Sequence, residues 1–519
     1  MKHRTIANLG RLDDLIADNT LQTIGLKLLE LSESPVVSLY DVCEIDRICY
    51  GNIAYEKLWN RLGLDSIIDS LMSRDQKLAY DVKQVLKFTV IHKLLQGTSK
   101  LDSFLNKGKY FGLGQGIQLH HIYSSMDFLS EHKDKLELAL FNKGRNLFNN
   151  EIDVAFYDVT TFHFESNRAD ELKDFGFSKA GKVNEVQVVL GLFTDRQGVP
   201  IGYELFSGST FDGKTMVSAL QILSQRFHIN KIIIVADKGL NDKNNFHLIR
   251  QAGYDYIVAS RLKSQSRRIK DMVFDGTGYQ VSNIDEQTSE VTFQYKTVDL
   301  NIQYWDEQKV KHQWTDKLLI TWSSKRANKA NKDRERQIEK ANKFIAGKAE
   351  MINRKGARRY VKIDDPLNAM AINLDQGQID KDAKWDGYYG IQFSNPKLSQ
   401  NEVLEAYKGL WHIEESFRIM KSTMKVRSIF HWTPKRIKGH FMMCFIGFLL
   451  ERHLEIQLKE KELPLSTEKI KRALNKLQLS IVTHRNDQYY MKSANGQYGA
   501  KILRALNIKP IPNVQRITQ

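Results

Sequence analysis

The most informative part of the sequence is residues 401–440, NEVLEAYKGLWHIEESFRIMKSTMKVRSIFHWTPKRIKGH. Apolar residues recur there at three- and four-residue intervals, which predicts a helix. Tyr407, Glu414 and Lys421 are seven residues apart, so on a continuous helix they lie along one face. A glutamate on such an apolar stripe is rarely buried without a partner. Either Glu414 pairs with Arg418 one turn away, or it points into a charged site where Lys421 reaches a phosphate.

Short apolar runs separated by amphipathic segments follow residue 150. Strands are predicted at 152–158, 184–194, 199–207, 231–237 and 254–260, with helices at 215–227 and 244–251. Strands that alternate with helices in this way predict an α/β fold, in which a mixed sheet is flanked by helices.

Two of these predicted strands end in an acid, Asp158 after IDVAFY and Asp237 after KIIIVA. In open α/β sheets, sites form at the carboxyl ends of the strands. One such aspartate is ordinary because Asp often starts a turn, but two of them with Glu414 on a later helix suggest a shared site. Converging carboxylates repel one another unless a cation lies among them, and a few carboxylates with substrate phosphates are what magnesium prefers. Two such ions stabilise both the attacking and the leaving oxygen of a phosphoryl transfer.

The charge balance of the chain points to a polyanionic partner. The 519 residues include 77 Lys and Arg against 61 Asp and Glu, which gives a net charge of +16. Nucleic acid is a more frequent partner of such a protein than a membrane, although a basic protein without a polyanionic partner is the alternative.

The cysteines and the apolar segments predict a cytoplasmic protein with no membrane partner. Cys43, Cys49 and Cys444 show no metal-binding spacing, and a reducing compartment fits them best. The first residues have no apolar signal segment behind them. The longest apolar run, residues 441–450, is too short to span a bilayer and predicts a buried helix.

The changes of pattern along the chain predict five regions. Helical periodicity marks 8–31, 81–95 and 122–141, apolar and polar residues alternate over 281–322, and 323–362 is rich in Lys, Arg and Asn. The predicted regions are a helical N-terminal region for DNA binding or dimerisation (1–150), the first part of a catalytic core (151–264), a β-rich insertion with a charged helix (265–380), the second part of the core with the Glu414 helix (381–460) and a C-terminal helical region (461–519).

Several motifs together resemble one family. The pattern Tyr407-x2-Leu410-x3-Glu414-x6-Lys421 resembles the Tyr-Arg-Glu-Lys signature of bacterial insertion-sequence transposases with an Asp-Asp-Glu triad. YDVTTFHFES (157–166) and VADKGLNDKNN (235–245) resemble the first and second Asp motifs of that family. KWDGYYGIQF (384–393) and HWTPKRIKGHF (431–441) resemble further stretches of one branch, so the similarity runs from about residue 80 to the C-terminus.

The resemblance implies a fold, a function and residue roles. The fold is a ribonuclease-H-like core, interrupted by a β-rich insertion that the 177 residues between Asp237 and Glu414 (414 − 237) can hold. Asp158, Asp237 and Glu414 would be the catalytic ligands of two Mg²⁺ ions, for which Mn²⁺ can substitute, while Tyr407 and Lys421 would contact DNA. The implied function is metal-dependent cleavage and strand transfer on double-stranded DNA, at terminal inverted repeats and at target DNA, by a homodimer.

The sequence departs from the signature at Leu410, where the family has Arg. A leucine cannot bind phosphate, so this role is either absent or taken by a neighbour such as Lys408 or Arg418. Because Arg418 lies one turn beyond Glu414 and has a planar fork suited to phosphate, we expect it to contact DNA.

The resemblance also implies that the insertion forms a module outside the catalytic sheet and carries an aromatic residue that stacks on a flipped base. Trp305, Trp314 and Trp322 are the candidates, and we expect core packing to be the role of at least two of them.

Two other functions fit the same residues. A metal-dependent nuclease without strand transfer would need the same acids, and a non-catalytic DNA-binding relic of a transposase would keep the basic charge. The presence of all three acids favours an enzyme. The nearby histidines are expected to be structural, because no zinc-binding spacing accompanies His412, His431 and His440.

Overall fold

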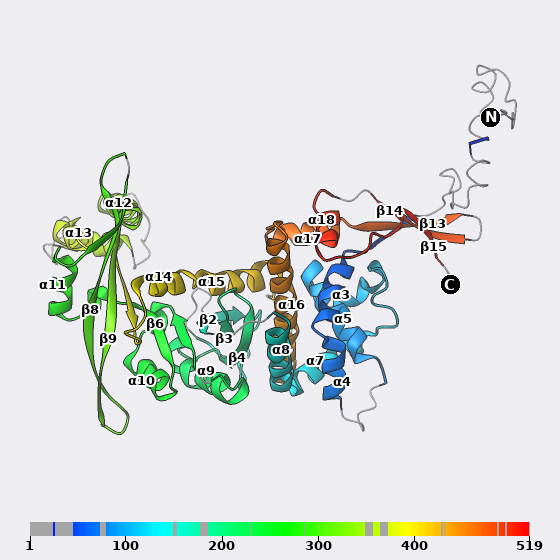
Figure 1. The fold of residues 1–519 in the computed structure, drawn as a ribbon, viewed down its shortest axis with the longest axis horizontal. Helices are drawn as coiled ribbons and strands as arrows, with labels where there is room; N and C mark the ends of the chain where they lie inside the picture. Colours follow the sequence, from blue (N-terminus) through cyan, green and yellow to red (C-terminus); the bar gives the residue numbers. More distant parts are fainter. Residues whose placement is uncertain are drawn as a thin grey trace, which may run out of the picture. The chain divides into compact units, whose positions relative to one another are not determined.

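A computed structural model describes the protein, and its chain divides into two compact units (Figure 1). We call residues 150–416 the central unit, and residues 1–149 together with 417–519 the terminal unit. The structure describes residues 24–25, 45–72, 79–148, 153–176, 185–229, 231–285, 287–347, 356–363, 372–426, 429, 431–484, 487–493 and 496–517.

The central unit is built on one mixed sheet. Nine strands are hydrogen-bonded in the order β4-β3-β2-β5-β6-β12-β9-β8-β7. The pairs β2–β5 and β5–β6 are parallel and all the others are antiparallel. The strands are β2 (Val154–His163), β3 (Gln187–Thr194), β4 (Pro200–Ser207), β5 (Ile233–Ala236), β6 (Asp255–Ser260), β7 (Gln280–Ile284), β8 (Val291–Trp305), β9 (Lys311–Ser323) and β12 (Tyr388–Phe393).

Helices cover this sheet, as the α/β prediction requires. In Figure 1, α14 (Gln400–Lys408) and α15 (Trp411–Arg418) run along one side, while α9 (Met216–Gln221) and α10 (Lys243–Gln251) lie along the other. The strands between them are apolar and closed to water, and all eight residues of β3 are buried. Continuous burial of this kind is expected for strands covered on both faces. The predicted fold class, a mixed sheet flanked by helices, is confirmed.

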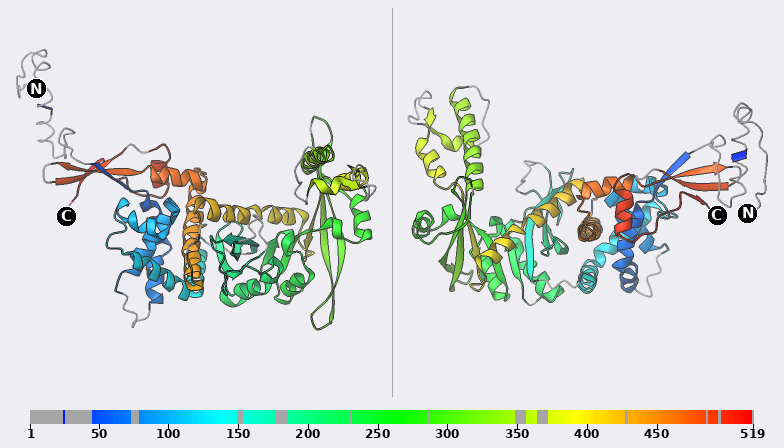
Figure 2. Two further views of the ribbon diagram at one scale, coloured as in Figure 1. Left: turned by 180° about the vertical axis from the view of Figure 1, so that it is seen from behind. Right: turned by 45° about the horizontal axis from the view of Figure 1, so that its top comes forward.

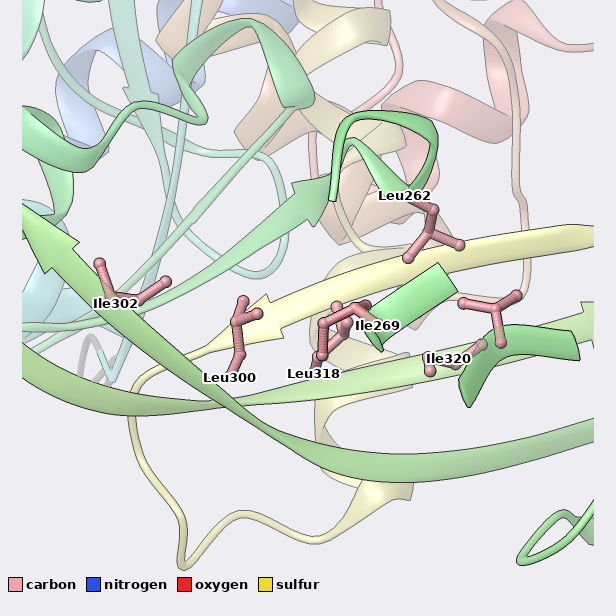
Figure 3. Close-up of a cluster of buried hydrophobic side chains, with 7 residues drawn as sticks. Leu262, Ile269, Leu300, Ile302, Leu318 and Ile320 are labelled. Carbon is pink, nitrogen blue, oxygen red and sulfur yellow. The ribbon is translucent and has the colours of Figure 1, made fainter. Parts of the chain in front are cut away.

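The insertion joins the sheet, and the prediction that it forms a module outside it is wrong. The predicted antiparallel strands are present, but β9 pairs with β12 and so attaches β8 and β7 to one end of the sheet. Apolar side chains of β8 and β9 pack against 3-10 helix η6 (Leu262–Ser264) and α11 (Arg267–Phe274) through a shared core (Figure 3). Its buried members are Leu262, Ile269, Val273, Leu300, Ile302, Leu318 and Ile320.

The β8–β9 hairpin leads into the charged segment that the sequence predicted to be helical. Figure 2 shows α12 (Ser324–Ile345) at one end of this hairpin, away from its turn. The same region holds 3-10 helix η7 (Ala357–Tyr360), a two-stranded sheet of β10 (Val361–Ile363) and β11 (Ile372–Leu374), and α13 (Gln376–Ala383).

The helix predicted through residues 401–421 is interrupted, which corrects the expected alignment of Tyr407, Glu414 and Lys421. After α14 the Leu410 N–H bonds the Tyr407 carbonyl, three residues back, and α15 begins at Trp411. A π-helical turn, η8 (Ile419–Thr423), then carries Lys421. A methyl group on Gly409 would lie 2.4 Å from Phe156 Cζ of β2, so the close approach of helix and sheet requires glycine at the break.

The terminal unit is mostly helical around α16 (Pro434–Glu460), which packs against α3, α5 and α7. Residues 441–450 of α16 are all buried, as predicted for this apolar run. A methyl group on Gly439 would lie 2.0 Å from the Met126 carbonyl oxygen, so α16 can approach α7 closely only with glycine there. The other helices are α3 (Asn52–Arg61), α4 (Leu64–Leu71), α5 (Val82–Leu95), α6 (Lys100–Leu105), α7 (Leu119–Glu131), α8 (Lys133–Phe148), α17 (Thr467–Asn475) and α18 (Gly499–Ala505).

A small antiparallel sheet completes the terminal unit. Its strand order is β1 (Ile45–Cys49), β13 (Gln478–His484), β14 (Asp487–Lys492) and β15 (Val514–Arg516). The helix predicted over residues 8–31 lies outside the described residues apart from 24–25. Among the helices that the structure describes, none has the length and apolar character needed to cross a membrane.

Candidate active site

Asp158 and Asp237 lie on neighbouring parallel strands at the same level. The parallel pairing of β2 and β5 ends with Tyr157 opposite Ala236. Asp158 is the next residue of β2, and Asp237 directly follows the end of β5. Adjacent strands are about 4.8 Å apart and residues at equal register face the same side of the sheet, so the two half-buried aspartates are neighbours. The structure thus brings together the two acids that the sequence predicted to share a site.

The two aspartates differ in their local structure. Asp237 follows β5 as predicted, and its side chain forms no capping bond to the 3-10 helix η5 (Lys238–Leu240) that starts there. Asp158 does not end its strand, because β2 continues to His163 through antiparallel pairing with β3. Its Oδ1 accepts a hydrogen bond from the Val159 N–H at 2.7 Å. The shared position is therefore the end of the parallel pair, not the end of two strands.

A pair of tyrosines lies near the same edge of the sheet. Tyr389 belongs to β12, where its neighbour Gly390 pairs with Ser260 at the carboxyl end of β6. The carboxyl end of β5 is adjacent, since β5 pairs in parallel with β6. The hydroxyl groups of Tyr389 and Tyr407 are 2.6 Å apart and form a hydrogen bond, which joins α14 to this edge.

The charges around the tyrosines show which acids are close to them. Burial raises the pKa of Tyr389, and the negative charges of Asp237 and Glu414 raise it further. Burial also raises the pKa of Tyr407, together with the charges of Tyr389 and Asp237. The Arg326 guanidinium lies 4.0 Å from the Tyr389 ring centre, a cation–π distance, and opposes these shifts. Asp237 and Glu414 therefore act on one tyrosine hydroxyl.

Glu414 is carried by the first turn of α15 and is exposed to solvent. The close contact of Gly409 with Phe156 fixes the start of this helix against β2, the strand that contains Asp158. His412, on the same turn, packs its Cβ against Gly198 at the β3–β4 hairpin turn, where a methyl group would lie 3.3 Å away. Contacts on both sides of the turn thus hold the backbone that presents Glu414.

The carboxylates suit a divalent cation only in part. Over the described residues, no group of three or more His, Cys, Asp or Glu side chains is close enough to hold a metal ion. The neighbouring pair Asp158 and Asp237 matches the one or two carboxylates that Mg²⁺ uses when substrate phosphates supply further ligands. Glu414 is exposed and does not form a group of three with them among the described residues.

The predicted DNA-contacting residues lie on either side of the division between the units. Tyr407 is half-buried in the central unit and bonded to Tyr389. Arg418, at the end of α15, is exposed, and Lys421 is half-buried with its Nζ 5.9 Å from the Phe417 ring centre. Leu410 stands where the family signature has an arginine. It is only 6% exposed and is a packing residue, as expected for a leucine. DNA contact by Tyr407, Arg418 and Lys421 remains a prediction.

The three candidate stacking tryptophans have different surroundings. Trp314 packs on the β8–β9 core and donates to the Tyr256 hydroxyl, and Trp322 donates to the Asp386 carbonyl. Trp305 is 60% exposed beside the hairpin turn, opposite Lys311. Lys311 and Trp322 are eleven residues apart on β9 (322 − 311), which corresponds to about 35 Å along the strand. Trp322 pairs with Tyr388, the neighbour of Tyr389 at the site. The exposed tryptophan is thus too far from the acids of its own unit to stack beside them.

Two residues of this edge, Tyr389 and Arg326, were missed in the sequence. Tyr389 lies within KWDGYYGIQF, and the resemblance of that stretch was a usable signal, although it did not single out one residue. Arg326 is one of many basic residues in a charged segment. Its place over Tyr389 follows from the end of β9 beside β12, which no local pattern predicts.

Two neighbouring acids thus lie at the end of a parallel strand pair on a mixed sheet, and they can supply the one or two carboxylates that Mg²⁺ takes from a protein. A model of the family described as "Transposase DDE domain" matches residues 149–450, more than half of the chain, and the chain belongs to this family. A solved structure that is similar, the cryo-EM structure of the piggyBac transposase synaptic complex with hairpin DNA, has a TM-score of 0.36 and 9% identity, over 83% of this chain and 80% of that chain. Comparison with curated proteins gives no match.

Proposed function

We propose that this transposase-family protein is the active enzyme of a bacterial insertion sequence, of the Tyr-Arg-Glu-Lys branch. It would cleave double-stranded DNA at the terminal inverted repeats of its element and join the ends to target DNA. The observation that carries the proposal is the equal register of Asp158 and Asp237 at the end of the β2–β5 pair, inside the family domain. The proposed core is ribonuclease-H-like, and the proposed assembly on DNA is a homodimer.

In this proposal the acids hold two divalent ions, Mg²⁺ or its substitute Mn²⁺. Asp158 and Asp237 are the fixed ligands, and Glu414 turns inward from α15 to complete the set. The bound ions would stabilise the attacking and leaving oxygens of the cut phosphodiester. The hydrogen bond between Tyr389 and Tyr407 holds α14 against the sheet. It would thereby keep Glu414, on the following helix α15, in one position through each round of cleavage.

The helix α12 supplies a surface for the DNA backbone beside this site. Its 22 residues carry eight Lys and Arg side chains and three acids, a balance of +5 (8 − 3). It starts directly after β9, and Arg326 in its first turn lies over Tyr389. A basic helix that begins at an acidic site can hold phosphates close to the ions without neutralising the acids.

A plasmid assay tests the proposal against its rivals. A supercoiled plasmid carries the genomic DNA that flanks the coding region on both sides, and the full-length protein is added with Mg²⁺. A transposase gives cuts at the repeat ends and joined strand-transfer products. A plain nuclease gives cut DNA alone, and a non-catalytic relic gives a shifted band without cutting. Absence of joined products with a preparation that binds these ends would overturn the proposed function.

A further inference from the structure

A cavity of about 400 Å³ lies in the terminal unit. Its walls are the end of α5, the loop that leads into α6, the start of α6, Tyr123 of α7, the segment before α16 and α16 itself. Its lining residues are Lys93, Gly97, Thr98, Ser99, Lys100, Leu101, Tyr123, Lys425, His431 and His440, and none of them is acidic. Among the residues that the structure describes, three lysines and two histidines line the cavity and no acidic side chain does.

Two of the lysines are buried, which is unusual for this residue. Lys93 and Lys100 are each only 5% exposed. Lys93 Nζ donates to the carbonyls of Thr98 and Lys425, at 3.3 and 3.0 Å. For Lys100, no hydrogen-bond or ion-pair partner occurs among the described residues, although its side chain lines the cavity. A buried ammonium group without a partner is costly, so this lysine calls for a ligand from outside the chain.

The electrostatics of the cavity agree with an absent anion. Burial, and then the charge of Lys93, lower the pKa of Lys100 to about 7. Burial, and then the charges of Lys100, Arg436 and Lys93, lower the pKa of His431 to about 3. All the shifts oppose positive charge, and an anion in the cavity would reverse them.

The backbone is also shaped around the cavity. Lys425 has a left-handed backbone conformation with φ of 48°, which turns its carbonyl to Lys93. Strain of this kind persists where surrounding contacts fix it, often at ligand sites. His440, which also lines the cavity, is buried, and its Nδ1 has no hydrogen-bond partner.

We propose that this cavity binds a phosphate group, with Lys100 and Lys93 as the cations that hold it. The volume exceeds the need of a single halide ion, and several donors around one centre suit the oxygens of a phosphate. The phosphate comes either from a DNA backbone or from a free phosphate or nucleotide. The proposal is independent of the proposed catalytic function, since a chain that never cuts DNA can bind phosphate here.

A cavity lined by lysine and arginine in the central unit shows why charge compensation matters. It is lined by Lys263, Arg326, Arg334 and Arg359 but also by Asp382 and Asp386. Arg334 bonds both oxygens of Asp386, and Lys263 bonds Asp382 at 2.7 Å. Its main cations already have partners in the chain, so it needs no external anion.

The test uses the full-length protein and inorganic phosphate, pyrophosphate and a duplex oligonucleotide as probes. Binding is measured by calorimetry, with chloride at equal ionic strength as the reference. The variants are Lys100→Met and Lys93→Met, which remove the ammonium group and keep most of the length of the unbranched side chain. Lys459→Met is the matched control, because Lys459 is exposed on α16 and the net charge changes equally.

We expect wild-type protein and Lys459→Met to bind phosphate or pyrophosphate, and Lys100→Met to bind at least about tenfold more weakly. If pyrophosphate competes with the oligonucleotide in the wild type but not in Lys100→Met, the ligand is the DNA backbone. If it binds without competing, the ligand is a free phosphate compound. Two results would overturn the proposal. In the first, Lys100→Met binds each of the three probes as tightly as the wild type does. In the second, a folded wild-type protein binds none of the probes.

Discussion

The central and terminal units place charge in opposite ways. In the central unit, Asp158 and Asp237 are neighbours, and the charges of Asp237 and Glu414 raise the pKa of Tyr389 beside them. The pKa of Tyr407 is raised as well. The terminal unit buries Lys93 and Lys100 in a cavity whose described lining residues include no acid. One arginine, Arg326, lies beside the three acids, and none of the described residues that line the cavity is acidic, so one sign of charge is in excess in each cluster. Each is therefore suited to a partner of opposite sign, a divalent cation in one unit and a phosphate in the other.

Removing charge from the acidic edge should give the largest effect. We expect Asp158→Asn, Asp237→Asn and Glu414→Gln each to slow cleavage in Mg²⁺ by about a thousandfold or more, because an amide is a poor ligand for this ion. DNA binding should persist, since the acids hold metal and not DNA. Glu405→Gln, an exposed position on α14, is the control. Cleavage near the wild-type rate by any of the three variants would remove that residue from the site.

Removing a lysine charge from the basic cavity should stabilise the fold. A lysine with a folded pKa of about 7 and an unfolded value of 10.5 loses affinity for its proton on folding. Its destabilising effect is therefore complete below pH 7 and fades as the pH rises to 10.5. At pH 6 we expect the free energy of unfolding of Lys100→Met to exceed that of the wild type by a few kcal/mol. This difference should become smaller toward pH 10. A gap that stays constant in denaturant titrations across this range would contradict the assigned pKa.

Leu410 and Arg418 separate packing from DNA contact on one helical segment. Leu410 is buried, so Leu410→Ala should lower the free energy of unfolding by about 3 kcal/mol with little change in DNA affinity. Arg418 is exposed, so Arg418→Ala should weaken end binding or slow cutting at unchanged melting temperature. Calorimetric melting and end-binding assays on both variants provide the test. The opposite assignment of effects would show that Arg418 has not taken the role of the signature's arginine.

The sequence predicted what local patterns control. The apolar run before Asp237 is typical of a buried strand, and the chain has β5 there. It failed where pairing partners decide the outcome. Asp158 lies within a longer strand because β3 pairs with the residues after it, and the 401–421 helix breaks where Gly409 meets Phe156. Both depend on tertiary contacts that no periodicity reveals.

The same limit applies to the insertion and to the cavity. Alternation predicted the strands of 281–322, but not that β9 would pair with β12 and extend the sheet. Lys100 looks like a surface lysine in the sequence, because lysines are seldom buried. Tyr389 was within a quoted motif, yet its contact with Tyr407 depends on the meeting of α14 and β12.

Breaking the tyrosine pair tests whether it positions the acid or only fills space. Tyr389→Phe removes the bond to Tyr407 with little loss of volume, and we expect about tenfold slower cleavage with unchanged end binding. Because burial raises the pKa of both tyrosines, the wild-type rate should show no loss from tyrosine ionisation up to about pH 10. Tyr407→Phe and the double variant complete the cycle. Additive effects of the two changes would mean that the hydroxyl groups do not act as a pair.

The smallest expected effect concerns the exposed lysines Lys325, Lys329 and Lys332 of α12. Each phosphate that a lysine neutralises releases counterions, so log affinity falls with log salt in proportion to the number of contacts. Replacing all three by glutamine should make the slope shallower by about 3 and weaken binding uniformly across DNA sequences. Cleavage of bound DNA should change little, because the acids are untouched. Lys459→Met in the terminal unit is the control and should leave the slope nearly unchanged unless its surface also touches DNA. If the triple variant kept the wild-type slope while Lys100→Met reduced it, the DNA backbone would be held by the terminal unit's cavity and not by α12, which would shift the DNA path from the acidic edge to the basic cavity.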